Sequence, residues 1–215
     1  MRWSVPDLAD AVERGLRKRA AADDAAQVVY GFDTLDELGL HPVVRESLTD
    51  AGYGAWPEQR YPGHVHKRSK AEGQRCDLVL TPPPEALPLR DPEVKHTLFD
   101  GEPAADPEAA YWLEIKTVAQ FETDGPFRRY SAELLSPVTK DVRKIWTDGK
   151  IRFGGLLLVL FTQSREIAEH DLAAWHTRCI DKGYPVGPPS VRGFAITDRV
   201  GNGWCAAAVF GVRGV

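Results

Sequence analysis

Hydrophobic positions recur with helical spacing at the start of the chain and in short, strand-like runs after it. The spacing predicts helices over 5–22 and 33–52, the second ended by a glycine. Runs rich in β-branched and aromatic residues predict strands over 56–61, 74–81 and 111–121. The chain therefore begins with two helices followed by three strands.

A second group of elements follows. A helix is predicted from Ser136, with Pro137 at its first turn, to Gly149, because serine caps and proline opens helices well. The run over 153–162 is apolar at successive positions, which is typical of a central strand buried on both faces. A helix over 165–182 and strands over 191–197 and 204–212 complete the order ααβββαβαββ.

Length and composition indicate one soluble α/β domain. The chain has 215 residues, 43% of them hydrophobic and 27% charged, close to globular averages. Its longest apolar run, Gly154 to Phe161, is far below the roughly 20 residues of a membrane span. The three cysteines form no metal-binding or disulfide pattern, and no targeting segment is visible at the N-terminus. We expect a cytoplasmic protein without a membrane partner.

The net charge of −4 is concentrated in one segment. Residues 81–110 hold seven acidic and two basic residues, so that the rest of the chain sums to +1. The same segment holds seven of the 16 prolines and is predicted to be an irregular acidic insertion. A nucleic-acid partner is therefore compatible with the acidic total.

The second and third predicted strands carry three charged residues among apolar neighbours, where charges are unusual. Glu114 and Lys116 alternate along 111–121 and therefore share one face of that strand. Asp77 lies in the preceding strand, although aspartate is disfavoured there. One explanation is a structural ion pair between the strands. The acid-x-Lys spacing alone is weak evidence for a functional site, because it occurs three times in the chain. Only this copy lies in an apolar strand that follows a strand with a lone acid.

With these residues in this order of elements, the sequence resembles the PD-(D/E)xK nuclease superfamily. The resemblance covers about 33–212. It implies a restriction-endonuclease-like fold, a mixed central sheet flanked by helices, over 33–215, with 1–32 as an N-terminal helical extension. Cys76 stands where the family has proline, and 37 residues separate Asp77 from Glu114, which is longer than is common.

The resemblance also implies a catalytic site and a cofactor. Asp77, Glu114 and Lys116 are the expected catalytic residues. The expected ligands of Mg²⁺, with Mn²⁺ as an alternative ion, are the carboxylates of Asp77, Glu114 and Glu46 and the carbonyl oxygen of Ile115. Glu58 competes with Glu46 for the place of the additional acid. Independently, two facing carboxylates suit magnesium, which would activate water beside a phosphodiester.

Basic residues after the third strand are candidates for binding nucleic acid. Between 125 and 152, seven basic residues stand against three acidic ones. A phosphate track and a solvated helix face are both compatible with this pattern. The candidates for the track are Lys140, Arg143, Lys144, Arg128 and Arg129.

The sequence therefore predicts a metal-dependent nuclease, with DNA favoured over RNA and endonuclease activity expected. The sequence leaves open whether two copies assemble into a homodimer that cuts both strands of a duplex. One alternative is a catalytically inactive module of the same fold that binds nucleic acid or another partner. Another is an unrelated globular protein in which Asp77, Glu114 and Lys116 form an ion-pair cluster.

Overall fold

The structure is a computed structural model that describes residues 3–64, 74–90, 103–135, 137–197, 199 and 201–214. Residues 91–102 of the predicted acidic insertion and Ser136, the predicted helix cap, lie outside the described residues. The elements are α1 (Val5–Ala25), η1 (Phe32–Thr34), α2 (Glu37–Asp50), β1 (Gly54–Arg60), η2 (Pro62–His64), β2 (Arg75–Thr81), β3 (Tyr111–Ala119), β4 (Phe121–Glu122), β5 (Gly125–Pro126), α3 (Tyr130–Leu135), α4 (Pro137–Thr147), β6 (Phe153–Thr162), α5 (Arg165–Asp181), β7 (Ser190–Ala195) and β8 (Trp204–Arg213).

The strands form one mixed sheet of six strands in the order β1-β2-β3-β6-β8-β7. The first three strands are antiparallel, β6 runs parallel to β3, and β8 is antiparallel to both β6 and β7. A parallel pair requires a crossover, and the segment with α3 and α4 supplies it. The predicted α/β architecture with a mixed central sheet is confirmed.

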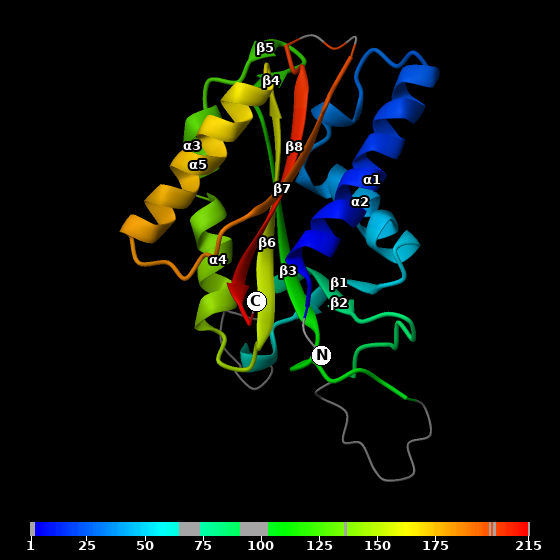
Figure 1. Cartoon of the computed structure of the whole chain (residues 1–215), viewed down its shortest axis with the longest axis vertical. Coiled ribbons are helices and arrows are strands. Elements are labelled where there is room, and N and C mark those ends of the chain that lie inside the picture. Colours follow the sequence, from blue (N-terminus) through cyan, green and yellow to red (C-terminus); the bar gives the residue numbers. More distant parts are fainter. Residues whose placement is uncertain are drawn as a thin grey trace.

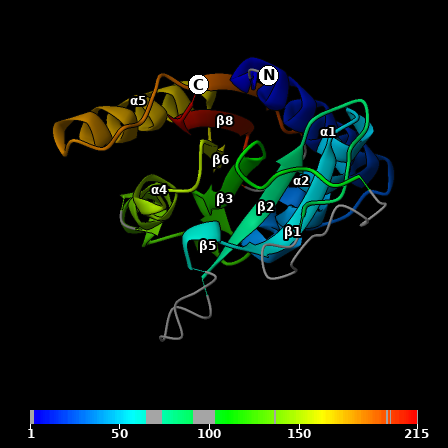
Figure 2. The ribbon, with the colours of Figure 1, turned by 90° about the horizontal axis from the view of Figure 1, so that it is seen from below.

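Helices cover both faces of the sheet (Figure 1). Helices α1 and α2 lie on one face, and α3, α4 and α5 lie on the other. The view from below shows the same separation for α1, α2, α4 and α5 (Figure 2). Each face has its own hydrophobic core, since successive strand residues point to opposite sides. Strand β6 serves both cores, because every residue after Phe153 in it is buried, as its apolar run predicts.

Helix α1, which makes up most of the predicted N-terminal extension, is packed into one of the two hydrophobic cores. Leu8, Val12 and Leu16 are fully buried and join the core that α2 also lines. Ser4 caps the helix by accepting a hydrogen bond from the amide of Asp7. Helix α1 packs against α2 and against β7 and β8. Without α1, the sheet would expose the apolar face of these two strands to solvent.

The predicted order of the main helices and strands is confirmed, and the described residues add five short elements, η1, η2, β4, β5 and α3. The strand predicted over 111–121 ends at Ala119 and is followed by the short β4–β5 hairpin. The short helix α3 has no separate signal in the sequence. None of the helices in the described part of the chain is long and apolar enough to cross a bilayer.

A close approach at Gly155 offers a test of this packing. A Cβ atom at Gly155 would overlap the carbonyl oxygen of Phe210 and the hydroxyl of Tyr111. We expect Gly155→Ala to lower the free energy of unfolding by roughly 1 to 3 kcal/mol, as overpacking does. Thermal unfolding should show a loss of about 2 to 4 °C per kcal/mol at this chain length.

Gly149→Ala is the matched control, because a Cβ atom there meets nothing within 4 Å. We expect it to change the stability by less than about 0.5 kcal/mol. Equal effects of the two substitutions would contradict the described packing between β6 and β8.

Candidate active site

Strands β2 and β3 separate at Asp77. Their pairing covers Leu80 with Tyr111 through Leu78 with Leu113 and then stops. Beyond that point, Oδ2 of Asp77 accepts a hydrogen bond of 2.8 Å from the backbone amide of Ile115. The aspartate carboxylate therefore replaces a backbone acceptor where the strands diverge, which explains an acidic residue inside this strand.

Glu114 points from β3 toward α4 and is completely buried. The hydroxyl of Tyr61 donates a hydrogen bond to Oε1, and Nζ of Lys144 lies 3.5 and 3.4 Å from the two carboxylate oxygens. Burial, and then the nearby charges of Asp77 and Asp141, raises the pKa of Glu114 to about 9, although Lys144 and Tyr61 act in the opposite direction. The ionised form of Glu114 is therefore stable at neutral pH only when positive charge lies close to its carboxylate.

Lys116 is held by the first residue of α2. Its Nζ lies 2.8 and 2.6 Å from the two carboxylate oxygens of Glu37 and 3.4 Å from Oδ2 of Asp141. Burial acts to lower the pKa of Lys116, but these two carboxylates raise it on balance. The ammonium group is therefore charged and fixed between α2 and α4.

Asp141 connects the two lysines. Its Oδ1 lies 2.7 Å from Nζ of Lys144, three residues later on α4, and its side chain is only 5% exposed. The charged groups follow one another as acid, lysine, acid, lysine, acid. We call these residues, together with the neighbouring Asp77, the acid–lysine cluster: Glu37, Asp77, Glu114, Lys116, Asp141 and Lys144. Its four acids and two lysines carry a formal charge of −2 when all are ionised.

One group of side chains in the described residues has the spacing of metal ligands. Glu37, His41 and Asp77 each offer a ligand atom, and these atoms lie within 4.8 Å of one another. Glu37 and His41 share a face of α2 because they are four residues apart. Nε2 of His41 is buried without a hydrogen-bond partner in the described structure, which fits a nitrogen that could bind a cation.

The two acids that the sequence offered as additional ligands lie elsewhere. Glu46 is 67% exposed and pairs at 3.3 Å with Lys18 of α1, because it lies more than two turns after Glu37 on another face of α2. The side chain of Glu58 is exposed on β1. Among the acids of α2, it is Glu37 that lies near Asp77, together with His41, and the Glu-x-x-x-His spacing of these two residues is the signal that could have identified them.

The five predicted nucleic-acid-binding residues do not share one surface role. Lys144 turns inward to Glu114, whereas Lys140 and Arg128 are exposed. The guanidinium of Arg143 donates to the hydroxyl of Tyr184 at 2.9 Å, and Arg129 pairs with Glu133 at 2.7 Å. Lys140 and Lys144, four residues apart on α4, are therefore divided between the solvent and the cluster.

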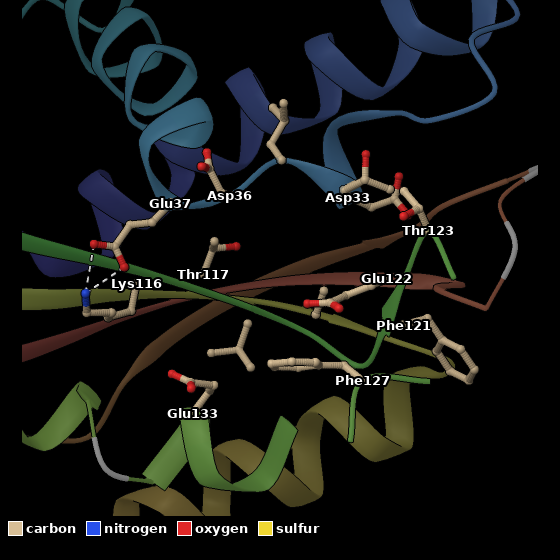
Figure 3. Close-up of a pocket in the computed structure, with 14 residues that line it drawn as sticks. Asp33, Asp36, Glu37, Lys116, Thr117, Phe121, Glu122, Thr123, Phe127 and Glu133 are labelled. Carbon is tan, nitrogen blue, oxygen red and sulfur yellow. Dashed lines mark hydrogen bonds and ion pairs between the residues drawn. The ribbon is translucent and has the colours of Figure 1, made fainter. Parts of the chain in front are cut away.

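A cavity of about 410 Å³ adjoins the cluster and shares Glu37 and Lys116 with it (Figure 3). Phe121 lies at its far end from Glu37 and Lys116, Phe127 lies between them, and Lys116 is the single basic residue among the lining residues. The acidic residues of the lining are Asp33, Asp36, Glu37, Glu122 and Glu133. This lining disfavours an anion in the cavity unless a cation accompanies it.

No known protein-family model matches the chain, and no curated protein or solved structure resembles it significantly. The geometry of the site is therefore the basis for the function proposed below.

The role of Asp77 at the strand fork can be tested through stability. Asp77→Asn keeps an acceptor for the Ile115 amide, so we expect its unfolding free energy to stay within about 1 kcal/mol of the wild type. Asp77→Ala leaves that amide without a partner and should cost roughly 1 to 3 kcal/mol. Chemical denaturation in buffer with EDTA compares the two variants.

Equal losses in the two variants would contradict the hydrogen bond as the reason for an acid at position 77. A loss of about 3 to 5 kcal/mol in both variants would instead assign the carboxylate to a buried structural ion pair, since either substitution removes its charge.

Proposed function

We propose that this chain is a divalent-metal-dependent nuclease with a restriction-endonuclease-like fold, acting on DNA in preference to RNA. The observation that carries the proposal is the position of Asp77 at the fork between β2 and β3, beside the strand that bears Glu114 and Lys116. The order of a helix, three antiparallel strands, a helix and a strand parallel to β3 supports the same assignment.

The donor set fits a divalent cation. Asp77, Glu37 and His41 would hold the ion, and Glu114 and the carbonyl oxygen of Ile115 stay predicted ligands by resemblance. An imidazole ligand suits Mn²⁺ better than Mg²⁺, which prefers oxygen and retains its waters. We therefore favour Mn²⁺, with Mg²⁺ as the alternative. When bound, such an ion activates water and neutralises charge on the phosphodiester.

The residues of the chain would supply the rest of the chemistry. Lys116 is charged, and its Nζ is held by Glu37 and Asp141, so its position is defined before a substrate arrives. An ammonium group placed in this way stabilises negative charge that develops on the phosphate oxygens. Phosphodiester hydrolysis, with endonucleolytic cleavage expected, is the reaction that this arrangement supports best.

A second candidate function is a catalytically inactive partner-binding module of the same fold. Two observations favour it: both lysines of the cluster are already paired with carboxylates, and the adjoining cavity is lined by five acids. Such a lining suits a basic segment of a partner better than a phosphate backbone. The two candidates differ in whether cleavage occurs.

A cleavage assay tests the nuclease proposal. Purified protein is incubated with supercoiled DNA, single-stranded DNA and RNA, each with Mn²⁺, with Mg²⁺ or with EDTA. We expect metal-dependent cleavage of DNA, and a loss of roughly 100-fold or more in Lys116→Ala, because one charge-stabilising group contributes about that much.

Asp50→Asn is the control for this assay. Asp50 lies at the end of α2, is 59% exposed and pairs with Lys18, away from the cluster. Its substitution should leave cleavage unchanged. Cleavage that survives Lys116→Ala at the wild-type rate would assign the activity to a contaminant or to another site, and absence of cleavage under all conditions would favour the inactive module.

Metal binding can be measured without activity. A ligand that binds only the folded state stabilises it by about 2.7 kcal/mol at 100 times its dissociation constant, so Mn²⁺ should raise the melting temperature by roughly 5 to 10 °C. His41→Ala should lose most of this increase. His170→Ala should retain it, because His170 is 80% exposed on α5. An equal increase in both variants would exclude His41 as a ligand.

A further inference from the structure

Lys144 lies against the carboxylate of Glu114, which the resemblance to the nuclease superfamily predicts to be a metal ligand. Its Nζ lies at nearly equal distances, 3.5 and 3.4 Å, from Oε1 and Oε2, so that it bridges the carboxylate. It is also 2.7 Å from Oδ1 of Asp141. The ammonium group therefore lies between the buried carboxylates of Glu114 and Asp141. The side chain of Glu114 is only 1% exposed.

Glu114 has little capacity for a further cation while this contact lasts. Oε1 also accepts the hydrogen bond from the hydroxyl of Tyr61, so both oxygens already have a partner. A divalent ion binds carboxylate oxygens at about 2.0 to 2.6 Å, which would bring it close to Nζ of Lys144. Two positive charges at such a separation repel each other strongly where water is scarce.

We propose that Lys144 and a divalent ion compete for the Glu114 carboxylate, so that Lys144 lowers the metal affinity of the site. This inference rests on the proposed metal-dependent function. When an ion binds Glu114, the ammonium of Lys144 moves off that carboxylate and keeps its contact with Asp141 on the same helix. Asp141 is thus the positioning residue that retains Lys144 beside the ion.

The sign of the effect follows from charge. Without Lys144, Glu114 would bind a proton more tightly, which by itself would weaken metal binding. The missing positive charge, however, favours a divalent ion twice as strongly as a proton, because the Coulomb energy scales with the charge of the cation. Neutralising Lys144 should therefore strengthen metal binding overall.

Titration calorimetry with Mn²⁺ tests this competition in the wild type and three variants. We expect Lys144→Gln to bind Mn²⁺ about tenfold more tightly or better. Lys144→Arg keeps the charge and should bind like the wild type. Lys140→Gln removes a charge from the same helix, one turn earlier and exposed to solvent, and should also bind like the wild type.

Unchanged or weaker binding in Lys144→Gln, with normal binding in the wild type, would overturn the competition and leave the metal site intact. Absence of binding in all four proteins would overturn the metal-dependent function as well. If Lys144→Gln does not fold, wild-type protein with ¹³C-methylated lysines is titrated with Mg²⁺. The Lys144 resonance should then move while that of Lys140 stays, and an unmoved Lys144 resonance would overturn the inference.

Discussion

The hydrogen bond from the Ile115 amide to the Asp77 carboxylate is the contact on which the arrangement of the candidate site depends. It takes over where the backbone ladder between β2 and β3 stops after Leu78 and Leu113. A buried amide needs a partner, so the strands can separate here only because a side chain supplies one. The separation places Asp77 at the fork and leaves Glu114 on the face of β3 that points toward α4.

The second constraint is charge. Buried carboxylates lie close together in the acid–lysine cluster, and two lysines from different elements compensate only part of their charge. The raised pKa of Glu114 expresses the cost of the remaining negative charge in a buried position. A divalent ion would remove that cost, and Lys144 is the group with which it would compete. The proposed metal binding would thus be coupled to the stability of the fold through the same residues.

The two hydrophobic cores bring the contributing helices to the sheet from opposite faces. Helix α2 packs on the face that Tyr111, Leu113 and Ile115 line, and α4 packs on the face that Trp112 lines. Their polar residues Glu37 and Asp141 meet at Lys116 of β3. The cluster therefore requires both cores to be formed, which ties the candidate site to the complete fold and not to one motif.

The sequence by itself determined the order of the helices and strands, the buried character of β6, and the unusual charges at positions 77, 114 and 116, because periodicity and local composition carry these features. The tertiary structure decided which groups meet: Lys116 pairs with Glu37, 79 positions away, and Glu114 with Tyr61, 53 positions away. It also decided that Glu37 and His41 face the cluster while Glu46 does not, and that Lys144 turns inward while Lys140 stays in solvent. The direction of a helix face depends on what the helix packs against, and that packing is set by contacts between distant segments, which local pattern does not encode.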